Sequence, residues 1–186
     1  MAKKHNTYGG GANTNTNGLS FEERTSLDKL LSDNGYVVHP DYTVSFNDNA
    51  VGYSIKKAKL STIFLRSKGI NYSSVNSKRW DPDEAFINLS NSTVYIIEKK
   101  FQGGNGSVDE KLATFQFKKY EYQKLFSPLG LKVEYLYLLS RNWFSQSKYK
   151  DYFDYMDANG CKHFFEDEFT LNDIGLRTFP VTEGNE

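Results

Sequence analysis

The sequence predicts a single α/β domain in which helices flank a mixed β-sheet. Helix-like and strand-like segments alternate along the chain, an order that favours helices packed on a partly parallel sheet. Two β-rich runs, residues 84–89 and 93–97, flank the polar triplet Ser90-Asn91-Ser92 and indicate a hairpin. The length of 186 residues is sufficient for one domain with a core of its own.

The first predicted element is a helix. Ser20 and Glu23 have capping-box spacing, so the helix is expected to start after Ser20 and to run to about residue 32. The apolar face of this helix consists of Leu27, Leu30 and Leu31. Asn34-Gly35 is expected to end it. The preceding residues are rich in Gly, Asn and Thr, which is typical of a flexible tail. The expected division is therefore a tail over residues 1–17 and one domain over residues 18–186.

The other elements follow from periodicity and turn residues. Short strands are predicted at residues 36–38 and 51–55, before the hairpin. After the hairpin, residues 103–106 predict a loop, and the apolar spacing in residues 108–126 predicts a helix. Alternation makes residues 132–139 the clearest strand, and an amphipathic helix is expected over about residues 145–156. A last strand is predicted at residues 163–165.

Charged residues gather at one end of the predicted hairpin. If the chain turns at Ser90-Asn91, Asp83 faces Glu98 across the ladder, with side chains roughly 5 Å apart. Lys100 follows Glu98 by two residues and therefore points to the same side of the sheet. Two carboxylates at one position suit Mg²⁺, which takes one or two carboxylates and completes its shell with water and phosphate oxygens.

The order Pro82-Asp83 and then Glu98-Lys99-Lys100 resembles the PD-(D/E)-x-K nuclease superfamily, to which many restriction endonucleases belong. The resemblance covers roughly residues 18–140 and is closest to small catalytic subunits of heterodimeric type IIS restriction endonucleases with a strand-nicking large subunit. It implies a restriction-endonuclease-like core and Mg²⁺-dependent hydrolysis of one strand of double-stranded DNA. It also implies that a larger subunit recognises the sequence, and that the protein is bacterial and cytoplasmic.

The resemblance assigns roles to the motif residues. Asp83 and Glu98 are expected to hold the metal, together with the backbone carbonyl of Lys99, the middle residue of the motif. Lys100 is expected to orient the attacking water or to neutralise charge that builds up on the phosphate. Asp83, Glu98 and Lys100 are thus the predicted catalytic set.

Further site residues are predicted outside the motif. Residues 18–22 resemble the first-helix signature of restriction enzymes that place a glutamate near the metal, so Glu22 is expected as a ligand. Helical periodicity instead turns Glu23 toward the apolar face, which leaves the choice between the two open. Gln102 lies on the same face as Lys100, and Gln116 and Tyr120 are one turn apart on the next helix. These three are predicted to support a metal-bound water or a phosphate.

The net charge is zero, but its distribution is uneven. Residues 49–80 contain seven basic and no acidic residues, whereas residues 151–186 contain nine acidic and two basic ones. A basic segment beside the predicted metal site suits a DNA backbone, although solvated surface is the alternative explanation. The predicted DNA-binding residues are Lys56, Lys57, Lys59, Lys78 and Arg79. A neutral sum argues against tight independent DNA binding, which agrees with a larger partner.

Several classes of protein are disfavoured. The sequence has no apolar run of 18 residues, so membrane insertion is not expected. The single cysteine, Cys161, excludes an internal disulfide and fits a reducing cytosol. The three histidines have no zinc-ligand spacing. Two alternatives stay open: a self-sufficient homodimeric restriction or repair nuclease of the same superfamily, and a noncatalytic DNA- or protein-binding module of the same fold.

Overall fold

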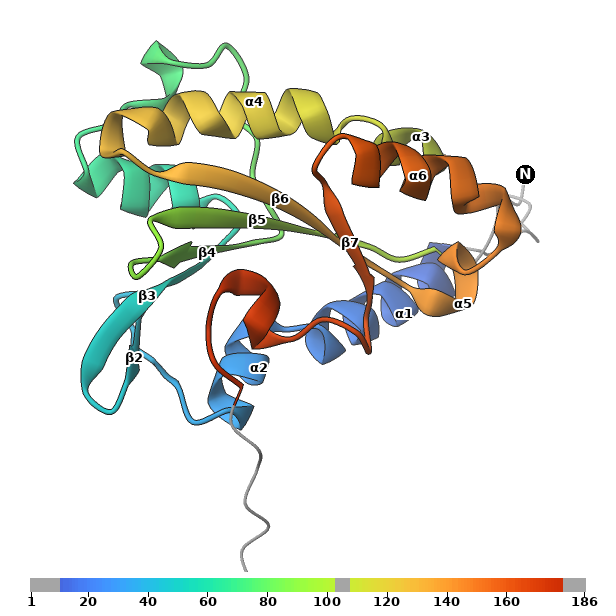
Figure 1. The fold of residues 1–186 in the computed structure, drawn as a ribbon, viewed down its shortest axis with the longest axis horizontal. Helices are drawn as coiled ribbons and strands as arrows, with labels where there is room; N and C mark the ends of the chain where they lie inside the picture. Colours follow the sequence, from blue (N-terminus) through green and yellow to red (C-terminus); the bar gives the residue numbers. More distant parts are fainter. Residues whose placement is uncertain (1–10, 103–107, 179–186) are drawn as a thin grey trace, which may run out of the picture.

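The computed structural model describes residues 11–102 and 108–178, and within them a seven-stranded sheet is flanked by helices (Figure 1). The strands are β1 Val37–Val38, β2 Thr43–Phe46, β3 Asn49–Lys56, β4 Glu84–Asn88, β5 Thr93–Lys100, β6 Lys132–Leu139 and β7 Lys162–Phe165. They lie side by side in chain order. The pairs from β1 to β5 are antiparallel, and β5, β6 and β7 are parallel. The predicted α/β class with a mixed sheet is confirmed.

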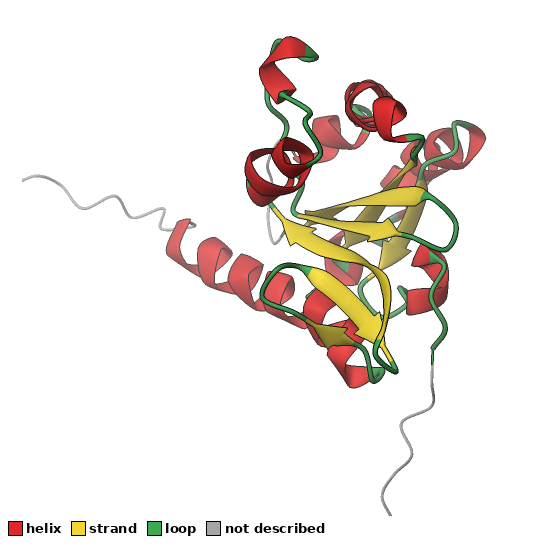
Figure 2. Cartoon of the chain, turned by 90° about the vertical axis from the view of Figure 1, so that its left-hand side faces the viewer, coloured by secondary structure: helices red, strands yellow, loops and turns green. Residues whose placement is uncertain are grey.

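Helices cover both faces of the sheet. The α-helices are α1 Gly11–Arg24, α2 Leu27–Asp33, α3 Val108–Leu112, α4 Phe115–Phe126, α5 Arg141–Phe144 and α6 Lys150–Ala158. A π-helical turn covers Leu60–Leu65, and 3₁₀ turns cover Tyr72–Ser74, Ser127–Leu129, Ser147–Tyr149 and Leu171–Ile174. Figures 1 and 2 show α3, α4 and α6 on one face and α1 and α2 on the other. The crossover between the parallel strands β5 and β6 runs through α3 and α4, as a parallel pair requires.

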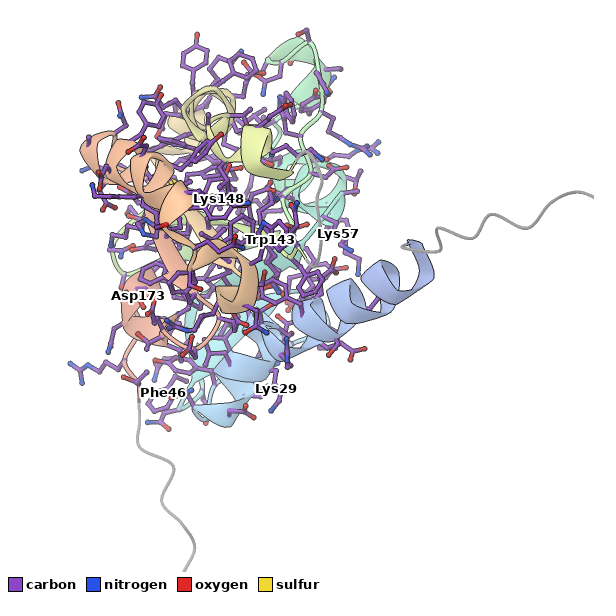
Figure 3. The ribbon with its side chains drawn as sticks, turned by 90° about the vertical axis from the view of Figure 1, so that its right-hand side faces the viewer. Lys29, Phe46, Lys57, Trp143, Lys148 and Asp173 are labelled. Atoms are coloured by element: carbon purple, nitrogen blue, oxygen red, sulfur yellow. The ribbon has the colours of Figure 1, made fainter. Side chains whose placement is uncertain are left out.

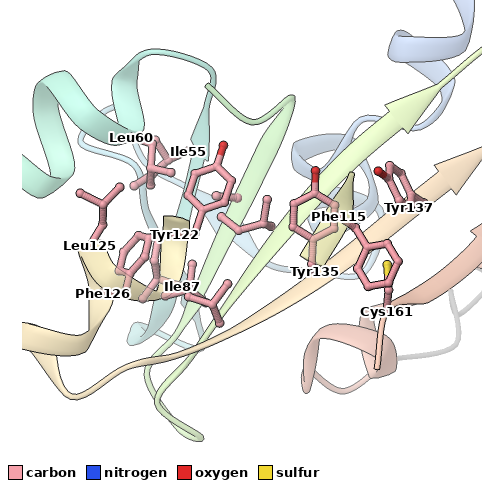
Figure 4. Packing of buried hydrophobic residues seen from close by; sticks show 14 of the residues in the cluster. Ile55, Leu60, Ile87, Phe115, Tyr122, Leu125, Phe126, Tyr135, Tyr137 and Cys161 are labelled. Carbon is pink, nitrogen blue, oxygen red and sulfur yellow. The ribbon is translucent and has the colours of Figure 1, made fainter. Parts of the chain in front are cut away.

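Strand β5 lies in the middle of the sheet and is buried on both faces. Its side chains alternate between two cores. Ile96 belongs to the core on the α4 face, which also contains Tyr122 and Tyr135 (both labelled in Figure 4), and Ile97 belongs with Leu31 to the core on the α2 face. The same alternation directs Glu98 and Lys100 to the α4 face and Lys99 to the α2 face. The central strand therefore presents successive charged residues to opposite sides of the sheet.

The hairpin of β4 and β5 has the predicted register. Glu84 pairs with Ile97 at one end of the ladder and Asn88 with Thr93 at the other. Continuing that ladder by one residue places Asp83 opposite Glu98. The turn is held by Asn88, whose side-chain oxygen accepts hydrogen bonds from Ser90 N and Ser90 Oγ at 2.8 and 2.7 Å.

The start of the first helix was predicted wrongly. Ser20 lies inside α1, which begins at Gly11, so Ser20 and Glu23 form no capping box. The break comes at Thr25-Ser26, and Ser26 is the N-cap of α2, where its side chain accepts from Lys29 N. Residues 11–17 of the predicted tail belong to α1, and the rest of that tail lies outside the described residues. At the break, the N–H of Leu27 bonds to the Glu84 carboxylate of β4, as described below.

Three other boundaries differ from the sequence prediction. Strand β2 was not predicted; it joins β3 through Asn47-Asp48, whose φ angles of 47° and 62° are those of a two-residue hairpin turn. The helix predicted over residues 108–126 is divided into α3 and α4, and the helix predicted from residue 145 begins at Lys150. The predicted loop at residues 103–106 lies outside the described residues. Within the described ranges, no helix is long and apolar enough to cross a bilayer.

The buried thiol of Cys161 gives a first testable expectation. Its side chain is in the α4-face core (Figure 4), and burial raises its pKa to about 12. The thiolate is the reactive form, so its fraction at neutral pH is about 3,000-fold below that of a free cysteine with a pKa of about 8.5. We expect a thiol-specific disulfide reagent to label the native protein very slowly and the urea-unfolded protein rapidly. Rapid labelling of the native protein would show that this core is open.

Candidate active site

The structure brings the three predicted catalytic residues together at the end of β5. Lys100 Nζ lies 2.7 Å from Glu98 Oε2 and 3.8 Å from Asp83 Oδ2. The same ammonium donates to the Lys99 carbonyl oxygen at 3.1 Å. Two carboxylates and one backbone carbonyl therefore surround a single positive charge.

Asp83 is held in place by the backbone of the neighbouring strand. Lys99 N donates to Asp83 Oδ2 at 2.7 Å, so the aspartate side chain extends the ladder beyond the first residue of β4. Burial raises the pKa of Asp83, and the negative charges of Glu98 and Glu22 raise it further. Lys100 and the Lys99 amide act in the opposite direction. The charge of Lys100 and the Lys99 N–H therefore favour the ionised form of this carboxylate against the effect of burial.

A second lysine, not predicted from the sequence, completes this cluster. Lys118 on α4 places Nζ 3.5 Å from Glu98 Oε1, so each oxygen of Glu98 faces an ammonium. Burial lowers the pKa of Lys118, and the positive charge of Lys100 lowers it further. One signal was available in the sequence: Lys118 lies three residues after Phe115 and four before Tyr122, on the buried face of the helix. A lysine on an apolar helix face needs a partner.

Gln116 and Tyr120 are not brought to this cluster. Each is two residues from Lys118, which is about 200° around a helix. Gln116 instead donates to the side chain of Asn159, the C-cap of α6, at 2.6 Å, and accepts from the hydroxyl of Tyr155 in α6 at 2.7 Å. The side chain of Tyr120 is exposed. Gln116 and Tyr120 are one turn apart on a helix, as predicted, but they lie on a different face of α4 from Lys118, which contacts the charged cluster.

Glu84 and Lys99 form a second charged group on the opposite face of the sheet. Lys99 Nζ lies 2.9 Å from Glu84 Oε2, and both side chains are 4% exposed. Leu27 N, in the first turn of α2, donates to both carboxylate oxygens of Glu84, at 3.2 and 3.1 Å. Burial raises the pKa of Glu84, and the charge of Lys99 opposes that shift. Glu84 therefore fixes the start of α2.

Glu22 lies beside the site, but its carboxylate is paired with Lys57. A pocket of about 400 Å³ is lined by residues of α1 and of the sheet end, among them Glu22, Glu23 and Asp83. Glu22 Oε2 lies 3.5 Å from Nζ of Lys57, the lysine labelled beside α1 in Figure 3. The Glu22 carbonyl accepts from Lys99 Nζ at 3.4 Å. The choice of Glu22 over Glu23 as a ligand stays a prediction.

Gln102 follows the end of β5 and is buried. Its backbone N–H donates to Ser140 Oγ at 3.4 Å, which ties the chain to the segment after β6. Its predicted role as a supporting residue stays a prediction.

The oxygens at the site fit a hard divalent cation. Within the described ranges, no three His, Cys, Asp or Glu side chains are arranged to hold a metal, so Glu22 does not complete a three-carboxylate set. The donors that converge are the carboxylates of Asp83 and Glu98 and the Lys99 carbonyl, and the Lys100 ammonium stands among them as a cation. Mg²⁺ in proteins takes one or two carboxylates, so two carboxylates with a carbonyl suit it.

The five predicted DNA-binding side chains all have anionic or aromatic neighbours. Lys56 pairs with Asp28, Lys57 with Glu22 and Arg79 with Asp81, whereas Lys59 and Lys78 lie over the rings of Tyr42 and Trp80. The pairs of Lys57 and Arg79 are solvent-exposed, and exposed pairs contribute only about 0–1 kcal/mol. The partners of Lys57 and Arg79 are therefore weak enough to be exchanged for phosphate, whereas Lys56 also lies 3.4 Å from the buried carboxylate of Glu84.

Comparisons of the chain with protein-family models, with curated proteins and with solved structures find no match. The residues themselves define an α/β domain with carboxylates and ammonium groups gathered at one end of its central strands. Such a group can bind a cation and a phosphate side by side. The charged pair on the opposite face, Glu84 and Lys99, is structural.

Proposed function

We propose that the chain is the catalytic subunit of a metal-dependent nuclease of the PD-(D/E)-x-K type, which hydrolyses phosphodiester bonds in one strand of double-stranded DNA. The observation that supports this proposal is the convergence of Asp83, Glu98 and the Lys99 carbonyl on one ammonium. The order of these residues along the chain and their places on an antiparallel hairpin also agree with that superfamily.

Each residue at the site would have a distinct role. Asp83, Glu98 and the Lys99 carbonyl would hold Mg²⁺, which polarises a phosphoryl oxygen and lowers the pKa of a bound water. Lys100 has only N–H donors and no acceptor, so it would orient the water or neutralise charge on the phosphate. Lys118 would pair with the second oxygen of Glu98. Two ammonium groups and two carboxylates make the net charge of these side chains close to zero.

The proposal includes a larger subunit that recognises the DNA sequence. Phosphate contacts provide most nonspecific DNA affinity, and a chain with zero net charge can make only a limited number of them. The basic side chains Lys56, Lys57, Lys59, Lys78 and Arg79 would then position the backbone rather than specify bases. We place both subunits in a bacterial cytosol.

The function can be tested by nicking of a supercoiled plasmid. With Mg²⁺ and the larger subunit, we expect cutting of one strand at a fixed offset from a short asymmetric site, and no cutting in EDTA. The purified chain alone should show little site-specific cleavage. Efficient double-strand cleavage by the chain alone would favour the homodimeric nuclease, and inactivity in every combination would favour the noncatalytic module.

The role of Lys100 can be separated from metal binding. In Lys100→Met, the missing positive charge should lower turnover by roughly 100- to 1,000-fold, the range for a lost charge-stabilising group. Mg²⁺ affinity, measured by calorimetry in the absence of DNA, should not fall, because an ammonium is not a ligand. Equal losses of Mg²⁺ affinity and turnover would show that Lys100 shapes the carboxylate pair instead.

A further inference from the structure

A second pocket, of about 540 Å³, lies away from the carboxylates. It is formed by the π-helical turn Leu60–Leu65 and by the segment that follows it, which stands out from the sheet beside α4 (Figures 1 and 2). Its polar lining comprises Ser61, Thr62, Arg66, Asn71, Ser73 and Arg79. None of its lining residues belongs to the Asp83–Glu98 site.

The lining of this pocket is positively charged. It contains two arginines and no acidic residue, and residues 49–80 contain no Asp or Glu. Arg66 is exposed and makes no ion pair with a described residue. Arg79 contacts Asp81 through Nε at 3.1 Å, and a guanidinium carries five N–H donors. The pocket is therefore suited to an anion.

The size and the remaining groups indicate what carries that anion. Ligand pockets range from about 300 to 1,000 Å³, so this one is larger than a bare phosphate needs. Ser61 and Thr62 donate their hydroxyl hydrogens to the Ala58 carbonyl at 3.0 and 2.9 Å, which leaves their oxygens as acceptors for a sugar or base. Ile70 and the ring of Tyr72 add an apolar wall. Charge, acceptors and apolar surface together match a nucleotide.

We infer that this pocket binds a nucleotide unit through its phosphate, with Arg66 and Arg79 contacting the phosphate oxygens. Arginine matches phosphate geometry with paired N–H donors, which favours this assignment over general surface attraction. The nucleotide can belong to a DNA strand or be free in solution, because the phosphate chemistry is shared. Binding here requires neither metal nor cleavage, so this inference and the proposed nuclease activity can fail separately.

The test uses the full chain in EDTA and compares two double variants with the same change in charge. Arg66→Ala/Arg79→Ala removes the pocket arginines, and Arg24→Ala/Arg177→Ala removes two exposed arginines outside it. Anisotropy of a labelled duplex oligonucleotide should show at least about tenfold weaker binding for the pocket variant. The slope of log affinity against log salt should also fall by about 2, one for each lost phosphate contact. The control variant should stay within about twofold of wild type.

Calorimetry with dAMP and with inorganic phosphate shows whether the phosphate that binds belongs to a free nucleotide or to a DNA strand. A loss of dAMP binding in the pocket variant would assign the pocket to free nucleotides as well, and a loss seen only with the oligonucleotide would assign it to a DNA strand. Thr62→Asp, which places a carboxylate in the wall and keeps both arginines, should reproduce the loss without a change in thermal unfolding. Equal behaviour of the two double variants in every arm would overturn the inference.

Discussion

Glu98→Gln should lower the rate of DNA cleavage by roughly 100- to 1,000-fold while the protein remains folded. Glu98 is paired with both site lysines, with oxygens 2.7 Å from Lys100 Nζ and 3.5 Å from Lys118 Nζ. The amide keeps the size of the side chain but removes the negative charge needed to hold a cation. Single-turnover nicking in Mg²⁺ with the larger subunit present measures the effect.

Glu134→Gln is a matched control for this prediction. Glu134 lies on the neighbouring strand β6 and is paired with Lys119 at 3.3 Å, on a partly exposed surface. The same chemical change there should leave cleavage near the wild-type rate. A urea unfolding curve for each variant separates lost chemistry from lost structure, and near-normal cleavage by Glu98→Gln would remove Glu98 from the catalytic set.

Glu84→Ala should reduce the free energy of unfolding by roughly 3–5 kcal/mol, because it leaves a buried charge without its partner. Lys99 is 4% exposed and would lose its carboxylate, and Leu27 N would lose its acceptor at the start of α2. Urea unfolding measures the change. Lys29→Ala, which breaks an exposed pair with Asp33, is the control and should cost no more than about 1 kcal/mol.

The double variant Glu84→Leu/Lys99→Met sharpens this test. Replacing a buried ion pair with apolar side chains of similar volume is often neutral, so it should recover most of the lost stability. Recovery would show that the unpaired charge causes the loss in Glu84→Ala. If the double variant is as unstable as the single one, the hydrogen bonds to Leu27 are the main contribution of Glu84.

The hairpin and the carboxylate pair could be predicted from the sequence because both depend on strand periodicity and a short turn. Once the turn at Ser90-Asn91 is placed, the facing of Asp83 and Glu98 follows without tertiary information. Lys118 could not be placed in this way, because its contact with Glu98 depends on how α4 packs over the sheet. The break before α2 likewise depends on Glu84, which lies 57 residues further along the chain. The function assigned to these residues stays a proposal.

Lys99 connects the two faces of the sheet through a single residue. Its N–H binds Asp83 and its carbonyl accepts from Lys100, while its ammonium reaches the Glu22 carbonyl and the Glu84 carboxylate on the other side. The two peptide planes that flank Lys99 are therefore oriented by α1 and α2 as well as by the hairpin. A shift of these two helices would rotate the oxygen that faces Lys100 and the N–H that aims Asp83. The geometry of the carboxylate pair thus depends mechanically on the packing of α1 and α2 on the opposite face of the sheet.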